Sequence, residues 1–198
     1  MPPPNAQRRG HLADAAITVL AERGSHGLTH RAVDATAAVP NGTTSRYFRT
    51  REALVSGVVE RITARINDRV QAFNVRPLDP DHLEAALVAI LTLMVSEDAR
   101  DALALFELHL EGTRNPRLRE TLTASLNDRR DLLLRQCRAA GLGLDEADAM
   151  QLEMSVLGIV FTTLTTGTED KDPKAAVRTA VRALLSRRLH QKSAVPAE

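Results

Sequence analysis

A run of short polar side chains that ends in an arginine stands out near the amino terminus of this 198-residue chain. Its members are Asn41, Thr43, Thr44, Ser45 and Arg46. Short side chains allow a helix to lie deep in the major groove of DNA, while asparagine and arginine reach the edges of adenine and guanine. The pattern therefore predicts a helix that reads base pairs.

Residues suited to phosphate lie on both sides of this run. Thr29 stands where it can cap a helix, and a capped helix N-terminus can hold a phosphate through its backbone N–H groups. Tyr47 offers a hydroxyl at the height of the DNA backbone, and Arg51 adds positive charge at the start of the next helix. Arg8 and Arg9 are candidates for a minor-groove arm, but a disordered basic tail is the interpretation that we favour.

Two short helices joined by a tight turn are predicted to position these residues. The first runs from the Thr29 cap to about Thr36, and the second opens at Pro40, where a first-turn proline is tolerated, and continues to Phe48. A longer helix follows over about 50–73. A helix-turn-helix of this kind places one helix end against the phosphate backbone and its second helix in a major groove.

The residues in this register carry a family resemblance. They are Gly27, Leu28, Thr29, Ala37, Val39, Gly42, Thr43, Tyr47, Phe48, Arg51, Glu52 and Leu54. At these positions the chain resembles the TetR family of bacterial transcription regulators. The resemblance implies a head that reads a DNA operator and a helical body that binds a small effector and forms a homodimer.

Three positions depart from the pattern of the family. Ala38 stands where the family favours a glycine, which predicts a turn that is slightly strained or differently set. Ser45 stands where a tyrosine is usual, and Arg51 replaces a usual lysine and preserves its charge.

Helical periodicity continues beyond this segment, and we find no convincing period-two strand. We therefore predict an all-α fold of nine helices. The predicted domains are a helix-turn-helix head at 1–54, whose bridging helix continues to about 73, and an effector-binding and dimerisation body at 75–190. A disordered tail is predicted at 191–198.

Apolar positions in the body suggest a pocket and an interface. Pocket candidates are Met94, Phe106, His109, Leu133 and Met154, although each alone is more often a satisfied or surface residue. The resemblance implies that the last two helices pair with their twins in a four-helix interface. Interface candidates are Leu157, Gly158, Phe161, Val181 and Leu184, and the alternative for this stripe is intramolecular core.

Charge and cysteine usage fit a regulator that meets DNA at one end. Residues 1–51 hold seven arginines and three acidic residues, a net +4, whereas the whole chain carries +1. Cys137 is the single cysteine, so no intrachain disulfide is possible. No secretory signal is visible, and the most apolar run, 85–95, is too short to span a bilayer. We expect a cytoplasmic protein.

No motif predicts an enzyme, a cofactor or a metal site: Gly-x-Ser-x-Gly, the phosphate-cradling Gly-x4-Gly-Lys and His-Glu-x-x-His do not occur. We predict a sequence-specific transcriptional regulator, most simply a repressor that a small effector releases from a near-palindromic operator. The alternatives are a helical bundle that acts through protein partners, and a bundle that binds or converts a small molecule without binding DNA.

Overall fold

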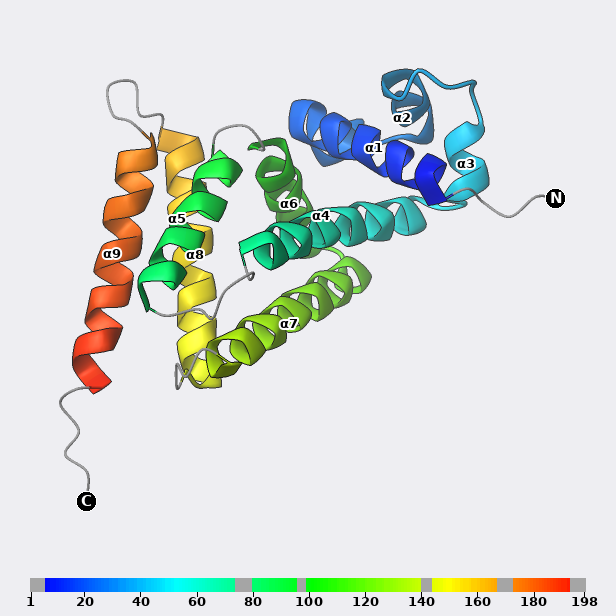
Figure 1. Cartoon of the computed structure of the whole chain (residues 1–198). Helices are drawn as coiled ribbons and strands as arrows, with labels where there is room; N and C mark the ends of the chain where they lie inside the picture. The colour runs from blue at the N-terminus through cyan, green and yellow to red at the C-terminus, as the bar shows by residue number, and fades with distance from the viewer. Residues whose placement is uncertain (1–5, 74–79, 96–98, 140–143, 167–172, 193–198) are drawn as a thin grey trace. The chain divides into compact units, whose positions relative to one another are not determined.

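Nine α-helices make up the residues that the computed structural model describes, which are 6–73, 80–95, 99–139, 144–166 and 173–192. Within these residues there is no strand, so the prediction of an all-α fold is confirmed. The helices are α1 (Ala6–Gly27), α2 (His30–Thr36), α3 (Thr43–Tyr47), α4 (Arg51–Phe73), α5 (Pro80–Val95), α6 (Ala99–Gly112), α7 (Pro116–Ala139), α8 (Glu146–Thr166) and α9 (Pro173–Lys192) (Figure 1).

The helices form two compact units. The first unit contains α1, α2, α3, most of α4, all of α6 except its first residue, and α7 as far as residue 129. The second contains α5, the remainder of α7, α8 and α9. The predicted head at 1–54 falls entirely within the first unit, which also takes in α6.

α1 buries the apolar stripe that its periodicity predicts. Leu12, Ala16 and Leu20, spaced four apart, have no exposed surface, because residues four apart lie on one face of a helix. The helical backbone is interrupted at Gly24, whose φ of 67° lies in the left-handed region that glycine adopts without strain. The buried apolar stripe thus ends at Leu20, about one turn before this interruption.

The start of α1 corrects the interpretation of the first arginines. Because α1 begins at Ala6, Arg8 and Arg9 lie in a helix and form neither a flexible arm nor a disordered tail. Arg9 donates to Glu60 of α4 at 2.9 Å, and its guanidinium lies 4.9 Å from the centre of the Phe48 ring. This arginine therefore ties α1 to its neighbours.

α2 begins as predicted. Thr29 is its N-cap, with extended backbone, and the Thr29 hydroxyl oxygen accepts a hydrogen bond from Ala32 N at 3.1 Å. The helix ends at Thr36, the predicted last residue.

α3 is shorter than predicted, because it begins at Thr43 and not at Pro40. Asn41 and Gly42 belong to a turn in which Thr43 N donates to Pro40 O at 3.1 Å. Gly42 is the N-cap and has a φ of 85°, so the chain enters the helix from a left-handed conformation. The proline therefore stands in the turn before the helix.

The turn between α2 and α3 holds the strain that its sequence predicts. Ala38 has a φ of 52°, in the left-handed region that disfavours a residue with a Cβ by roughly 1–2 kcal/mol. It is the only non-glycine residue with positive φ in the part of the chain that the structure describes. Alanine in place of glycine therefore raises the energy of this turn, but the turn still forms.

An ion-pair network joins three helices of the first unit. Asp14 of α1 accepts from Arg61 and Arg65 of α4, each at 2.6 Å. Arg65 also donates to the buried Asp101 of α6 at 2.6 Å. These charge-assisted bonds fix the register of α1, α4 and α6.

α6 buries some of its large apolar residues and exposes others. Leu103 and Leu110 are exposed, whereas Ala104, Leu105 and Leu108 belong to the core of the first unit.

In the second unit, α9 packs against α5 and α8 (Figure 1). Leu91, Val160 and Val177 are buried there. α9 continues to Lys192, so the tail predicted at 191–198 overlaps its last turn, and residues 193–198 lie outside the described residues.

α8 is apolar yet largely unburied. By length and composition it could cross a bilayer, with a mean hydropathy of 1.2 over an 18-residue window of which 17% is buried. Such a helix is weak evidence for a membrane span, and α8 also carries Glu153, which accepts from Arg130 of α7 at 2.7 Å. Its exposed side chains include Met150, Met154 and Phe161.

Candidate nucleic-acid interface

A buried carboxylate fixes the amino end of α3. Asp34 of α2 is 1% exposed and accepts three hydrogen bonds, from Gly42 N at 2.7 Å, from Thr44 N at 2.7 Å and from the Thr44 hydroxyl at 2.5 Å. Burial raises the pKa of Asp34, but the hydrogen bonds from Thr44 and Gly42 outweigh it and hold the pKa below its usual value. The ionised Asp34 therefore acts as an N-terminal cap supplied by another helix.

Thr44 was predicted to contact DNA, and this prediction is wrong. Its side chain is fully buried, and its hydroxyl donates to Asp34. The cause is the period of the helix, since one member of a polar run must face inward when its neighbours face outward. The sequence pattern alone does not distinguish the inward threonine from the outward one.

The carboxyl end of α3 is held by a histidine of α2 and by packing against α4. His30 Nε2 donates to Phe48 O at 2.7 Å, and Phe48 itself is buried. Gly57 of α4 makes this packing possible, because a Cβ there would stand 2.3 Å from the Phe48 ring. Both ends of a five-residue helix are thus fixed by groups outside it.

The outward face of α3 carries a small set of groups that can meet base pairs. Arg46 is exposed and forms no ion pair with any residue that the structure describes. Ser45 is exposed and Thr43 partly so, and their hydroxyls donate to backbone oxygens of the preceding turn, at 2.9 Å and 2.6 Å. Their oxygens remain able to accept, while Arg46 supplies a fork of donors. Asn41 is exposed in the turn that precedes α3.

The predicted phosphate contacts differ in availability. Thr29 is exposed at the N-cap of α2, as a backbone contact requires. Tyr47 is partly buried and packs against the core of the first unit. Arg51 is partly exposed, but its guanidinium is bound to Glu111 of α6.

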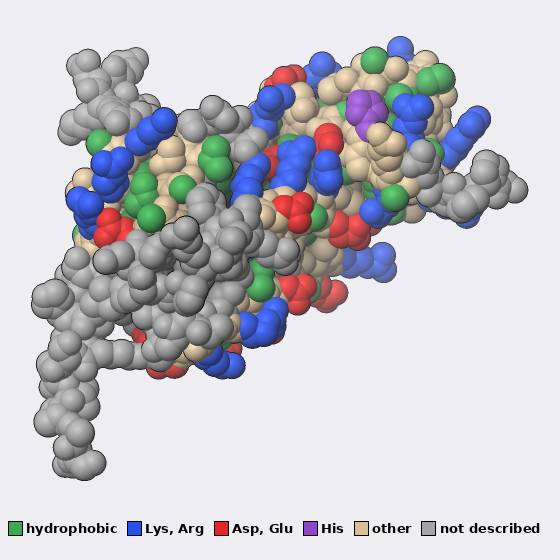
Figure 2. All heavy atoms as spheres, viewed as in Figure 1, with side chains coloured by type: hydrophobic (Ala, Val, Ile, Leu, Met, Phe, Trp, Pro, Cys, Tyr) green, Lys and Arg blue, Asp and Glu red, His purple; other side chains and the backbone are tan. Residues whose placement is uncertain are grey.

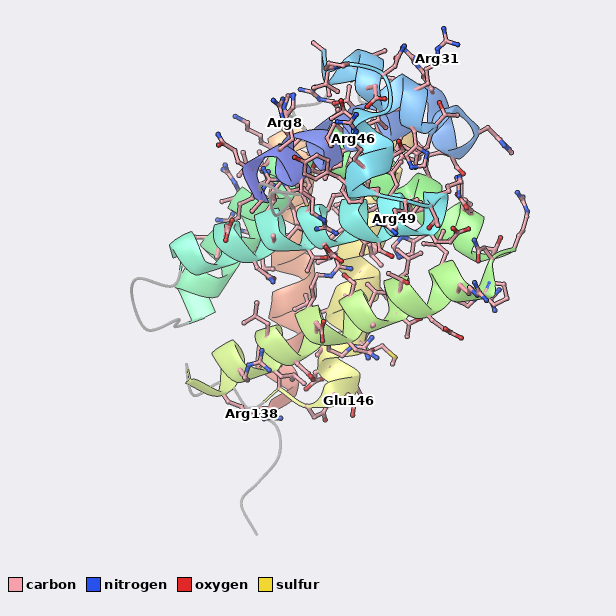
Figure 3. The ribbon with its side chains drawn as sticks, turned by 90° about the vertical axis from the view of Figure 1, so that its right-hand side faces the viewer. Arg8, Arg31, Arg46, Arg49, Arg138 and Glu146 are labelled. Atoms are coloured by element: carbon pink, nitrogen blue, oxygen red, sulfur yellow. The ribbon has the colours of Figure 1, made fainter. Side chains whose placement is uncertain are left out.

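This surface includes two further arginines, which the motif did not single out. Arg31 on α2 and Arg49, between α3 and α4, are both exposed. In Figure 3, Arg49 lies beside Arg46 at α3, whereas Arg31 projects away from α3 on α2, and Figure 2 shows basic side chains spread over the surface of these helices. The excess of arginine in residues 1–51 was the signal that could have found them.

The predicted pocket residues fall in both compact units. Phe106 and His109 belong to α6 in the first, and Met94 and Met154 belong to the second, where Met94 is buried and Met154 is 68% exposed. Their grouping into one pocket stays a prediction. The side chain of Leu133 lies outside the described residues, as does that of Cys137.

The predicted interface residues separate into two groups. Phe161 of α8 is 50% exposed, Gly158 is exposed and Leu157 is partly exposed. Val181 of α9 is only 1% exposed, because this face of α9 packs on α5 and α8 of its own chain, so its assignment to the interface is corrected to intramolecular core. The side chain of Leu184 lies outside the described residues.

A helix-turn-helix with a capped, polar recognition helix among arginines, on an all-α scaffold, defines a DNA-binding transcriptional regulator. Comparison with known proteins gives the family. Residues 12–58 match the family model described as bacterial regulatory proteins of the tetR family, and residues 78–187 match the model described as a tetracyclin repressor-like C-terminal domain. The chain belongs to the TetR family.

Individual relatives agree. The chain is 30% identical to the HTH-type transcriptional regulator BetI of Cronobacter sakazakii over 169 residues, which cover 78% of this chain and 82% of the relative. Among solved structures, a TetR-family member from Streptomyces coelicolor A3 is 27% identical, with a TM-score of 0.71 over 90% of this chain and 98% of the other. The multidrug binding protein EbrR, complexed with ethidium, is 29% identical, with a TM-score of 0.66 over 89% and 98%.

Proposed function

We propose that this regulator is a homodimeric repressor that binds a near-palindromic operator and leaves it when a small effector binds. The observation that carries the proposal is the pairing of two exposed surfaces on one chain: the polar face of α3, which presents Arg46, and the apolar face of α8. The first surface suits a base-pair edge, and the second suits a copy of itself.

The apolar face of α8 supports the dimer. Met150, Met154 and Phe161 are 45%, 68% and 50% exposed. Gly158 lies among them, and a Cβ at this glycine would have no atom within 4 Å, which leaves room for close approach of a second helix. Exposed apolar patches of this kind are buried in stable assemblies, and a twofold axis pairs such a patch with itself.

Twofold symmetry determines the form of the operator. Two copies of α3 related by a dyad meet adjacent major grooves when they stand about 34–36 Å apart, one turn of DNA. The two half-sites of the operator are then inverted copies of each other. An effector releases the operator by favouring a spacing that adjacent grooves do not match.

His109 supports an effector contact in the body. Its Nδ1 donates to Leu105 O at 2.7 Å, which leaves Nε2 as the acceptor of the imidazole in that tautomer. Nε2 is buried and has no hydrogen-bond partner among the described residues. A donor group of the effector would satisfy this nitrogen. The similar multidrug binding protein EbrR is known in complex with a small molecule, ethidium. We place the protein in the cytoplasm, where its operator would be.

Selection of bound sequences from random duplexes tests the proposal. We expect enrichment of inverted half-sites one helical turn apart, and loss of that enrichment in an Arg46→Ala chain that still binds DNA weakly. Compounds are then screened for release of the selected duplex, with His109→Phe as the variant that should respond less. Enrichment of a single asymmetric site, or of no sequence, would contradict the dimeric operator.

A further inference from the structure

Arg51, at the start of α4, is held by α6. Its Nη1 donates to Glu111 Oε1, and its Nη2 donates to Glu111 Oε2 at 2.8 Å. Nη2 also donates to the backbone oxygen and to the hydroxyl of Ser25, each at 3.1 Å. The Ser25 hydroxyl in turn donates to Glu111 Oε2, which closes a three-residue cluster.

This cluster removes Arg51 from the set of free cations on the head. A guanidinium has five N–H donors, and both terminal nitrogens of Arg51 are already bound. The hydrogen bond to Arg51 lowers the pKa of Glu111, so the carboxylate is ionised at neutral pH and offsets the charge of the arginine. In this arrangement Arg51 adds little attraction for a polyanion.

The arginine nevertheless lies within reach of the DNA-facing side. Its side chain is 38% exposed, against 17% for Glu111. An open groove of about 590 Å³ adjoins it, and the lining includes Thr29, the exposed N-cap that is predicted to meet phosphate. A phosphate at that rim and the carboxylate of Glu111 are alternative partners for the same guanidinium, since both accept its bidentate fork.

We propose that Glu111 competes with a DNA phosphate for Arg51 and so lowers the affinity of the head for any duplex. Glu111 is an affinity-setting residue that acts through Arg51 and does not itself touch DNA. The inference rests on DNA binding by the head, and it replaces the simpler expectation that Arg51 is always a phosphate contact.

The test compares Glu111→Gln with a matched control in the full chain. Glutamine keeps the shape of Glu111 and removes its charge. Glu107→Gln removes a carboxylate one turn away on the same helix, where Glu107 accepts from Ser25 N at 3.0 Å and has no ion pair with Arg51 among the described contacts. Dissociation constants are measured for one random duplex over a series of salt concentrations, and thermal melting verifies that each variant is folded.

We expect Glu111→Gln to bind about fivefold more tightly at low salt, with a salt slope steeper by about one unit, because one more phosphate is neutralised. Glu107→Gln should change the slope little. Arg51→Ala should also change the slope little in the unaltered chain, but in the Glu111→Gln background it should abolish both gains.

Other results would overturn the inference. Weaker binding and a flatter slope in Glu111→Gln would mean that Glu111 orients Arg51 toward the DNA. Tighter binding that persists without Arg51, or that Glu107→Gln reproduces, would indicate a general effect of negative charge. If the unaltered chain binds no duplex at any salt concentration, the proposed function fails together with this inference, whereas unchanged affinities in a chain that does bind DNA remove the inference alone.

Discussion

α3 and α8 solve opposite problems with the same secondary structure. α3 has five residues, exposes polar side chains and is held at both ends by Asp34 and His30 from outside the helix. α8 has 21 residues and exposes Met154 and Phe161. Its cap is local, because Asp145, the residue before the helix, accepts from Asp148 N. The proposed role of α3, contact with base edges, needs fixed geometry, whereas the proposed role of α8, pairing with a second copy, needs apolar area.

The difference in length explains where each helix draws its stability. A helix of five residues cannot persist in water, because nucleation costs more than its few hydrogen bonds return. α3 therefore depends on the buried carboxylate of Asp34 and on the packing of Phe48. α8 is long enough to depend less on any one contact, so single substitutions should affect the two surfaces in different ways.

The largest effect is expected from Asp34→Ala. The change leaves Gly42 N, Thr44 N and the Thr44 hydroxyl without their acceptor in a buried place, which should lower the free energy of unfolding by about 3–4 kcal/mol. Operator affinity should fall with it. Urea unfolding and duplex binding measure the two losses, and Thr44→Val, which removes only the hydroxyl, should cost about 1 kcal/mol.

The carboxylate of Asp34 also makes the free energy of unfolding depend on pH. Because the pKa of Asp34 is lowered in the fold, its ionised form stabilises the native state above the unfolded pKa of about 4, and this contribution is lost as the pH falls through the lower folded pKa. Unfolding curves between pH 7 and acid should therefore show a steeper loss in the unaltered chain than in Asp34→Ala. Parallel curves would argue that Asp34 is not the group that titrates.

The second effect is expected at α8. Phe161→Glu places a charge on the exposed apolar face and should convert the proposed dimer into monomers, which sedimentation would detect. Operator affinity should fall by about 100-fold or more, because the second half-site no longer binds with the first. The monomeric chain should stay helical, although its melting temperature should fall with the loss of the dimer. Thr123→Glu on the exposed side of α7 is the control, and an equal loss of the dimer there would make the change non-specific.

The third effect concerns base recognition alone. Arg46→Ala should weaken operator binding by roughly 1–3 kcal/mol while binding to random DNA changes far less. The dimer and the free energy of unfolding should stay as they are, because Arg46 is exposed. Arg31→Ala is the comparison, since an exposed arginine on α2 is expected to weaken both duplexes alike. Equal losses on both duplexes in Arg46→Ala would restrict it to phosphate.

The smallest expected effect is a gain in the free energy of unfolding. Ala38→Gly relieves the positive φ of the turn and should raise the free energy of unfolding by about 1 kcal/mol, less the entropy that glycine adds to the unfolded chain. Urea unfolding measures it. Ala35→Gly, at an exposed position inside α2, should instead destabilise the chain by a similar amount.

The sequence predicted those features that follow from local rules. Thr29 caps α2 because threonine has the required hydroxyl one residue before the helix. The stripe of Leu12, Ala16 and Leu20 is buried because its period is that of a helix. Ala38 is strained because the turn requires a positive φ whatever residue occupies it.

Features that depend on partners distant in sequence were not predictable in this way. The burial of Thr44 and the binding of Arg51 are decided by Asp34 and Glu111, and nothing in the local pattern names those carboxylates as partners. The exposure of Leu110 follows from which face of α6 meets the core, which several apolar positions leave open. A residue type indicates what a side chain can do, and packing decides which of these uses is available.

The brevity of α3 has a consequence for the genome that such a protein scans. Five residues make about one and a half helical turns, and Thr44 faces inward, so each subunit can question only a few base pairs. A sequence of only a few base pairs recurs by chance throughout any chromosome. In the proposed dimer, discrimination comes from two inverted half-sites at a fixed spacing, so the distance between the half-sites carries as much information as their bases.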